Sequence, residues 1–223
     1  MENTESVIKY SGVNISLEKT ILTNINLELK KGEFVYLIGK TGSGKSSLLR
    51  SIYADIPVET GSAFVCGFTL NGLKKSKIPL LRRKLGIVFQ DFQLLKDRTV
   101  YDNLAFVLKA TGWKDKKQMK ERILQALDDV GLLMKAYEQA CDLSEGEMQR
   151  VSIARAIVNQ PELILADEPT GNLDPITSEE IVRLLMEINQ KHGTTVLMAT
   201  HDYIVLDKFR AKILACEDGT IKS

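Results

Sequence analysis

The sequence predicts an α/β fold built on a mainly parallel sheet, with an antiparallel β region near the N-terminus and an inserted helical region. Four apolar runs favour buried strands: residues 34–38, 85–89, 163–166 and 195–199. Stretches with helical character separate these runs, and strands that alternate with helices form parallel sheets. A glycine or a polar residue follows each run, so we expect these residues to meet at the carboxyl edge of the sheet.

Bulk properties are those of one compact domain. The chain has 223 residues and is 44% hydrophobic, which is enough for a sizeable core. Its net charge of +1 argues against nucleic-acid binding. The three cysteines share no metal-ligand spacing and predict reduced thiols. No apolar run approaches the ~18–20 residues of a membrane span, so we expect any membrane role to come through a partner.

The N-terminal part predicts the antiparallel region. Residues 7–30 read as short strands joined by turns, and polar and apolar residues alternate late in residues 21–29. This alternation is typical of a half-exposed strand. Residues 61–67 predict a further short strand.

The first strong motif follows the run at residues 34–38. Residues 39–46 read G-x-x-x-x-G-K-S, and the glycines let backbone N–H groups curl around anionic oxygens. A predicted helix begins there and adds its positive dipole. We expect Lys45 to bridge the β- and γ-phosphates of ATP and Ser46 to ligate Mg²⁺. The predicted ATP-binding residues are Gly39, Lys40, Thr41, Gly42, Ser43, Gly44, Lys45, Ser46 and Ser47.

From residue 91 to residue 142 the character changes to helix. The apolar residues Met119, Ile123, Ala126, Leu127 and Val130 fall on one helical stripe. We expect a single domain over residues 1–223, with a core at about 1–90 and 161–223 and a helical subdomain at about 91–160.

Residues 144–147 fit a capping box, with serine at the cap and glutamate three residues on, before a helix over residues 148–159. The same helix start offers the Ser144 hydroxyl and the Gly146 N–H to a γ-phosphate. No predicted strand or glycine-rich loop lies beside it in the sequence. We therefore expect Ser144, Gly146 and Glu147 to complete the nucleotide site of a second copy of the chain.

Two adjacent carboxylates end the run at residues 163–166. Successive residues of a strand point different ways, so we expect Asp167 and Glu168 to have different roles. Asp167 is predicted to hold the metal. Glu168 is predicted to orient, or accept a proton from, the water that attacks the γ-phosphorus. In the turn that follows, Asp174 is placed to cap the next helix.

Gln90 and His201 follow the two remaining runs. The amide of Gln90 is able to contact Mg²⁺ and the attacking water, and His201 is able to donate to the γ-phosphate and hold that water beside Glu168. Either residue alone means little, and each gains weight from the other motifs. The predicted catalytic residues are Glu168, His201 and Gln90, and the predicted metal ligands are Ser46, Gln90 and Asp167.

In combination these motifs resemble those of ABC-type ATP-binding subunits over nearly the whole chain. The resemblance identifies a Walker A loop at 39–46, a Q-loop at Gln90, a signature at 143–147, a Walker B strand ending at 167–168, a D-loop at 172–174 and the switch His201. It implies a P-loop NTPase core of the RecA type. It also implies two ATP molecules held between the subunits of a homodimer, and a transmembrane partner docked near Gln90 and the helical subdomain.

Within that family, residues 89–103 and 165–174 resemble the ATP-binding proteins of bacterial cell division. The resemblance implies a peripheral subunit at the cytoplasmic face of the inner membrane, which relays ATP cycling through an integral membrane protein to cell-wall hydrolases. Two alternatives stay open: the ATPase subunit of a lipoprotein-release or macrolide-type exporter, and an ATP-binding scaffold with little turnover. Residues 92–95 are expected to form part of the partner groove, with local core packing as the alternative.

Two positions depart from the family pattern. Glu145 stands where the signature usually carries glycine, and a carboxylate there either repels ATP or points to solvent. The family stacks adenine on an aromatic residue well before the Walker A loop, but residues 15–17 are Ile-Ser-Leu. We therefore expect adenine to rest on aliphatic surface near Leu17.

Overall fold

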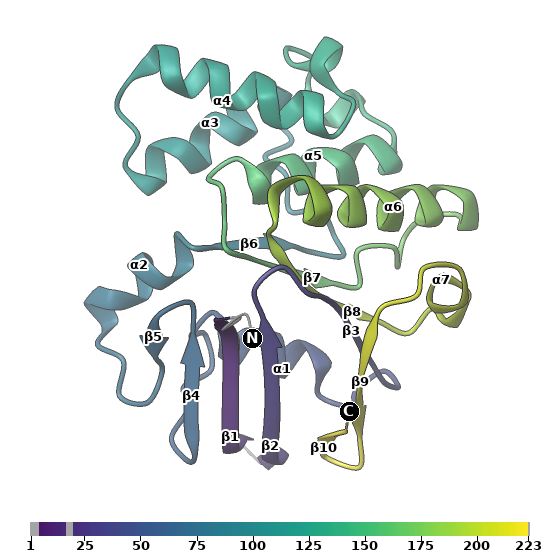
Figure 1. Cartoon of the computed structure of the whole chain (residues 1–223). Helices are drawn as coiled ribbons and strands as arrows, with labels where there is room; N and C mark the ends of the chain where they lie inside the picture. The colour runs from purple at the N-terminus through teal and green to yellow at the C-terminus, as the bar shows by residue number, and fades with distance from the viewer. Residues whose placement is uncertain (1–4, 17–19, 223) are drawn as a thin grey trace.

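The computed structural model describes residues 5–16 and 20–222 and confirms the predicted α/β architecture (Figure 1). An antiparallel sheet has the strand order β2-β1-β4-β5, and a main sheet has the order β10-β9-β3-β8-β7-β6. In the main sheet the neighbours from β9 to β6 are parallel, and only the β9–β10 pair is antiparallel. The strands are β1 (Ser6–Ser16), β2 (Thr20–Lys30), β3 (Phe34–Ile38), β4 (Ser62–Val65), β5 (Phe68–Thr69), β6 (Leu85–Val88), β7 (Leu163–Asp167), β8 (Thr195–Thr200), β9 (Lys212–Glu217) and β10 (Thr220–Lys222).

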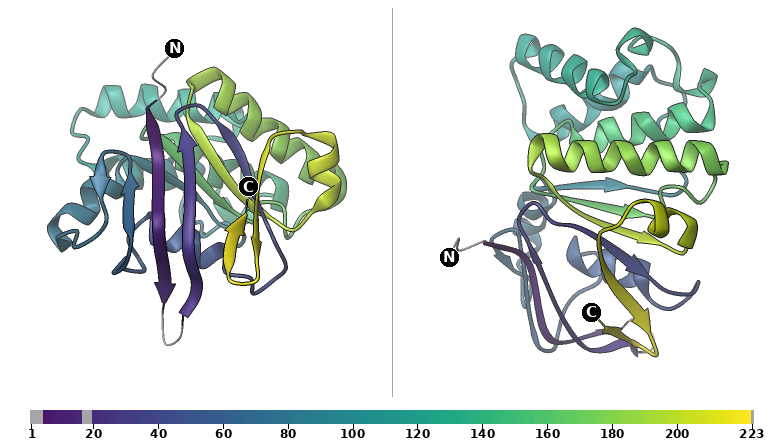
Figure 2. Two further views of the ribbon diagram at one scale, coloured as in Figure 1. Left: turned by 60° about the horizontal axis from the view of Figure 1, so that its bottom comes forward. Right: turned by 45° about the vertical axis from the view of Figure 1, so that its right-hand side comes forward.

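Helices cover the main sheet on both faces. Helices α3 to α6 lie on one face, whereas α1 and the antiparallel sheet lie on the other (Figure 2). The α-helices are α1 (Lys45–Ile52), α2 (Ile78–Arg82), α3 (Val100–Thr111), α4 (Lys116–Asp129), α5 (Glu145–Ile157), α6 (Pro175–His192) and α7 (Tyr203–Lys208), and the short 3-10 turns are η1 (Lys75–Lys77), η2 (Leu133–Lys135) and η3 (Ala140–Asp142). None of the helices in the described part of the chain combines the length and hydropathy that a transmembrane span requires.

The central strands are buried on both faces, and this explains their unbroken apolar sequences. On β3, Tyr36 packs into the hydrophobic cluster beneath α3 to α6, whereas Val35 and Leu37 pack into the cluster shared with α1 and the antiparallel sheet. Because side chains alternate along a strand, every residue of such a run needs an apolar partner. The core therefore holds the carboxyl ends of β3, β6, β7 and β8 in fixed positions.

The helical region differs from the prediction at its start. Residues 91–99 form turns and irregular backbone rather than helix, and α3 begins only at Val100. Phe92 and Gln93 have φ angles of 58° and 48°, which no α-helix accommodates. The stripe on α4 is as predicted, with Met119, Ile123 and the rest of its apolar residues buried.

Asp129 ties the end of α4 to the end of α6. Its side chain is only 1% exposed, and its carboxylate accepts hydrogen bonds from Lys191 Nζ at 2.7 Å and Gln125 Nε2 at 3.2 Å, with His192 Nε2 at 3.1 Å. Burial by itself raises the pKa of Asp129, but the hydrogen bonds from Lys191 and Gln125 outweigh it, and the pKa lies below its usual 3.8. Folding therefore favours the ionised carboxylate.

Replacing Asp129 by asparagine is expected to lower the free energy of unfolding at pH 7 by about 2 kcal/mol, because hydrogen bonds to a buried charge are lost. The carboxylate contributes this stability above its unfolded pKa, so the difference from wild type should be complete above about pH 5 and vanish as the pH falls through the lower pKa of the folded state. Urea unfolding across this range measures the effect. The exposed neighbour Asp128, replaced in the same way, is the control and should change little.

Candidate functional site

The predicted site residues gather at the carboxyl edge of the main sheet, where β3, β6, β7 and β8 end. A cavity of about 570 Å³ opens there, which we call the first cavity. It is lined by Ile21, Thr41, Gly42, Gly44, Lys45, Ser46, Ser47, Gln90, Asp167 and Glu168. The structure thus places the glycine-rich loop (residues 39–46), the Gln90 loop and the carboxylates of β7 around one space.

Glycine is required at two positions of the glycine-rich loop. A Cβ atom on Gly39 would lie 2.5 Å from the Cys216 carbonyl oxygen, which is closer than atoms approach. Gly44 has a φ of 108° and lies against Leu22 of β2, where a Cβ would be 2.9 Å from Cδ2. The loop therefore adopts its curl only with glycine at both places.

The side chain of Lys45 reaches back to the start of the glycine-rich loop. Lys45 is 4% exposed, and its Nζ donates to the carbonyl oxygens of Gly39 at 2.8 Å and Lys40 at 3.3 Å. The same ammonium group lies 3.4 Å from Glu168 Oε1. A buried cation is thus held between the loop and the end of β7.

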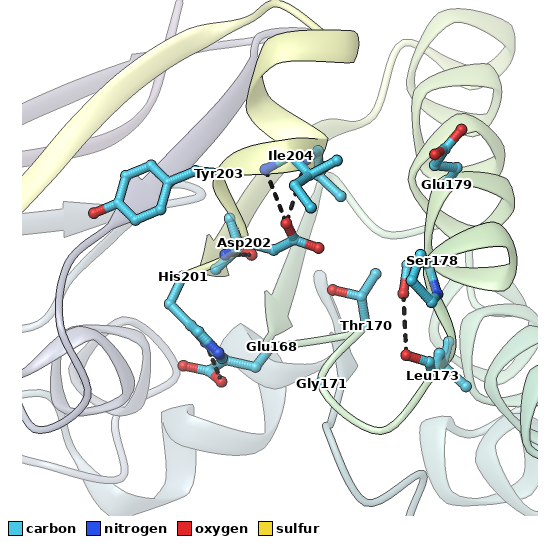
Figure 3. Close-up of a pocket in the computed structure, with 13 residues that line it drawn as sticks. Glu168, Thr170, Gly171, Leu173, Ser178, Glu179, His201, Asp202, Tyr203 and Ile204 are labelled. Atoms are coloured by element: carbon cyan, nitrogen blue, oxygen red, sulfur yellow. Dashed lines mark hydrogen bonds and ion pairs between the residues drawn. The ribbon is translucent and has the colours of Figure 1, made fainter.

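Glu168 lies between Lys45 and His201. Its Oε1 faces Lys45, and its Oε2 lies 2.9 Å from His201 Nδ1 (Figure 3). Glu168 has a φ of 48°, and its backbone N–H donates to the Ala199 carbonyl oxygen of β8 at 3.0 Å. A left-handed glutamate costs about 1 kcal/mol, and the bond to β8 helps to hold it there.

Asp167 is directed toward the start of α1. The Ser46 hydroxyl donates to Asp167 Oδ1 at 3.1 Å. Burial raises the pKa of Asp167 and the nearby Glu168 carboxylate adds to this, while the bond from Ser46 opposes it. A carboxylate whose ionised form is disfavoured by its surroundings gains from a cation beside it.

A second cavity of about 450 Å³ shares Glu168 with the first (Figure 3). It is lined by Glu168, by residues 200–205, which include His201, and by part of residues 170–179. Tyr203 and Ile204 on α7 are both 62% exposed at its rim. Asp174 caps α6 as predicted, accepting from the N–H groups of residues 176 and 177.

The loop at Gln90 packs against the D-loop segment. Asn172 Nδ2 donates to the Gln90 carbonyl at 3.0 Å. A Cβ on Gly171 would lie 2.9 Å from Gln90 Nε2, so the amide rests directly on that glycine. The loop at Gln90 and the D-loop segment are therefore in direct contact within one chain.

The predicted signature residues lie elsewhere in the molecule. Ser144 caps α5 in a capping box with Glu147, which also pairs with Lys135 at 2.7 Å. Gly146 packs on α6, where a Cβ would lie 2.8 Å from Thr177 Cγ2. Of the described residues, those that line either cavity include none of this helix start. Glu145 is exposed and forms no ion pair within the described ranges.

Sequence reasoning missed one lining residue. Ile21 of β2 borders the first cavity, whereas Leu17 lies outside the described residues. The alternating pattern predicted the strand but did not indicate that β2 passes the glycine-rich loop. The contact of Gly44 with Ile21 and Leu22 shows that it does.

Comparison with known proteins places this geometry in a family. The model of a family described as ABC transporter matches residues 22–171. The cell division ATP-binding protein FtsE of Bacillus subtilis is 46% identical over 200 residues, which cover 90% of this chain and 87% of the relative.

Two solved structures share the fold. The cbiO1 protein of Clostridium perfringens, part of the ABC transporter complex cbiONQ, has a TM-score of 0.90 at 27% identity. The match covers 98% of this chain and 88% of the cbiO1 chain. A dimeric post-hydrolysis state of the ATP-binding cassette MJ0796, bound to ADP and Pi, has a TM-score of 0.83 at 34% identity and covers 97% of both chains.

These matches confirm the fold class, the family resemblance and the ATPase activity predicted from the sequence. Relatives named FtsE are 45–47% identical over about 90% of this chain. The chain therefore belongs to the ABC transporter family, as an ATP-binding and ATP-hydrolysing subunit similar to the cell division ATP-binding protein FtsE.

Proposed function

We propose that this ATPase drives a membrane complex of bacterial cell division, as a homodimer that partners an integral membrane protein of the FtsX type and activates cell-wall hydrolases. The observation that carries the catalytic part is the position of Glu168 between Lys45 and His201, at 3.4 and 2.9 Å. The likeness to FtsE supports the biological setting.

The chemistry follows from these contacts. Lys45 turns from the loop carbonyls to the β- and γ-phosphates of ATP, and the N–H groups of residues 39–47 surround the same oxygens. Glu168 accepts a hydrogen bond, and then the proton, from the water that attacks the γ-phosphorus. His201 donates to the γ-phosphate and keeps that water beside Glu168. Ile21 supplies aliphatic surface for the adenine in place of an aromatic ring.

Mg²⁺ fits the oxygen donors at the start of α1. Ser46, Asp167 and Gln90 would hold it, and these hydroxyl, carboxylate and amide oxygens are the ligands this ion prefers. The raised pKa of the Asp167 carboxyl supports a cation at this place, because the ion relieves the cost of a buried charge. When bound, Mg²⁺ neutralises charge on the transferring phosphoryl group.

The nucleotide site is completed by a second protomer. Ser144, Gly146 and Glu147 begin a helix whose N–H groups and hydroxyl suit a phosphate. They lie away from both cavities of their own chain, so the γ-phosphate they bind belongs to the partner's ATP. Asp174 fixes the D-loop segment that faces the partner.

The membrane partner docks between the core (residues 1–90 and 161–223) and the helical subdomain (residues 91–160), which keeps the subunit at the cytoplasmic face of the inner membrane. A groove of about 200 Å³ lies there, lined in part by Phe89, Gln93, Val107 and Arg155. Leu95, two residues after Gln93 in the chain, is 37% exposed. Leu94, by contrast, packs against the core, so the local-packing interpretation holds for that residue.

Leu95→Glu is expected to reduce co-purification with the co-expressed FtsX-type protein about tenfold, because a carboxylate in an apolar contact is costly to desolvate. Phosphate release by the isolated subunit should stay within about twofold of wild type. Ile213→Glu on β9, 43% exposed and remote from the groove, is the matched control. Equal recovery with both variants would contradict the docking site, and no recovery with wild type would contradict the proposed partner.

Two other functions stay as proposals of lower support. The lipoprotein-release and macrolide-type exporters share the same motifs, and the same co-purification with their membrane subunits would distinguish them. A scaffold with little turnover is favoured only by Glu145, whose exposed carboxylate sits one residue after Ser144. Steady phosphate release by the purified protein would contradict the scaffold, and very slow release would favour it.

A further inference from the structure

Helix α5 holds the loop that follows Gln90 through one side chain. The guanidinium of Arg155 donates to the carbonyl oxygen of Phe92 at 2.7 Å and to that of Gln93. Both acceptors belong to one short segment, so a single planar group fixes two consecutive peptides.

The clamped segment is strained. Phe92 and Gln93 are consecutive non-glycine residues with φ angles of 58° and 48°. Left-handed backbone is unfavourable for residues other than glycine and persists only where surrounding contacts enforce it. The two bonds from Arg155 are contacts of that kind, and they act on the very residues that carry the strain.

Gln90 lies two residues before this segment and has two further contacts. Its carbonyl accepts from Asn172, and its amide rests on Gly171. Those contacts place Gln90 against the D-loop segment, and Arg155 fixes the chain on its other side. Gln90 therefore rests on the loop that follows β7, and the chain just after it is held by α5.

The same helix also holds the loop of Glu168. Gln149 is fully buried, and its Nε2 donates to the Pro169 carbonyl at 2.7 Å. Gln149 and Arg155 are six residues apart on α5, about 9 Å along the axis. The helix that begins at Ser144 therefore touches both loops that approach the γ-phosphate region.

We propose that Arg155 is a positioning residue for ATP hydrolysis: its guanidinium holds the loop at residues 92–93 so that Gln90 is presented to the first cavity. Through α5, this position depends on the helix start at Ser144. A shift of that start on the partner's nucleotide moves Arg155 with it and re-aims Gln90. The inference rests on the proposed role of Gln90.

The chain offers a matched control for Arg155. Arg122 on α4 also donates its guanidinium to two carbonyl oxygens, those of Ile157 at 2.8 Å and Val158 at 2.9 Å. These acceptors lie at the C-terminal end of α5 and belong to neither loop. Replacing either arginine by glutamine removes an equivalent pair of bonds, but only one pair supports Gln90.

The test measures kcat, the KM for ATP and the melting temperature of R155Q and R122Q, each in wild-type and Gln90→Ala backgrounds. R155Q should lower kcat about tenfold with KM within about twofold, since a misplaced side chain impairs chemistry more than binding. R122Q should lose similar thermal stability but keep kcat within about twofold. R155K, which keeps the charge but loses the planar fork, should fall between wild type and R155Q.

The backgrounds separate the possible failures. In the Gln90→Ala protein, R155Q should lower kcat no further, because both changes disable one element. If Gln90→Ala itself retains wild-type kcat, the proposed role of Gln90 fails and this inference with it. If Gln90→Ala is impaired but the two effects multiply, or if R122Q lowers kcat as much as R155Q, only the inference is overturned. Should R155Q not fold, R155K in the same two backgrounds decides the matter.

Discussion

Glu168→Gln is expected to lower the rate of ATP hydrolysis about a thousandfold while leaving ATP affinity within about threefold of wild type. The amide keeps the shape of the side chain but does not take a proton from water. Lys45 and the rest of the glycine-rich loop still hold the phosphates, and the left-handed backbone at residue 168 is held by its bond to β8. Phosphate release and binding of a fluorescent ATP analogue measure the two quantities separately.

Glu179 supplies the control for this substitution. It lines the second cavity and pairs with Lys208, so Glu179→Gln makes the same chemical change close to the site but away from Lys45. Its phosphate release should stay within about twofold of wild type. If Glu168→Gln released phosphate as fast as wild type, Glu168 would lose its proposed role.

Ser144→Asp is expected to lower ATP hydrolysis about a hundredfold, whereas Ser144→Asn should cost less than about fivefold. Serine, aspartate and asparagine are all good helix caps, so each variant can still accept from the Glu147 N–H. The Ser144 hydroxyl also donates to Glu147 Oε2 at 3.0 Å, and only asparagine can replace that donor. The variants differ in one negative charge, which in our account faces the γ-phosphate bound by the partner. Like charges in a closed site repel by several kcal/mol.

The melting temperatures of both Ser144 variants should match that of wild type within a few degrees, because the cap is kept and the lost hydroxyl bond of the aspartate variant to Glu147 is solvent-exposed. Hydrolysis is then compared at saturating ATP. Equal rates for the aspartate and asparagine variants would mean that residue 144 faces no phosphate, and the proposed dimer site would be wrong.

The strands and their ends could be predicted because each depends on a local pattern. The runs at residues 34–38 and 163–166 contain no polar residue, as burial on both faces of a sheet demands. The motif at residues 39–46 needs its glycines for the backbone itself, and the close approach of Gly39 to Cys216 gives a second reason that no local pattern contains.

The contacts between loops could not be predicted from local patterns. Arg155 and Gln149 lie on a helix whose sequence indicates only amphipathic packing. The acceptors of Arg155 are 62 and 63 residues away in the chain, and the acceptor of Gln149 is 20 residues away. The sequence predicts helix at residues 91–99, where the structure has turns, because the positive φ angles fall on Phe92 and Gln93, residues that rarely adopt them. Long-range hydrogen bonds hold such a turn, so its sequence carries no signal for it.

The most direct test mixes two inactive variants of the same chain. Lys45→Ala destroys the glycine-rich loop's grip on phosphate, and Ser144→Asp blocks the helix start, so each variant alone should hydrolyse almost nothing. If opposite protomers build each site, mixed dimers contain one intact site, and the mixture should recover about a quarter of the wild-type rate. A mixture no faster than the sum of the two variants would show that no site is shared between protomers.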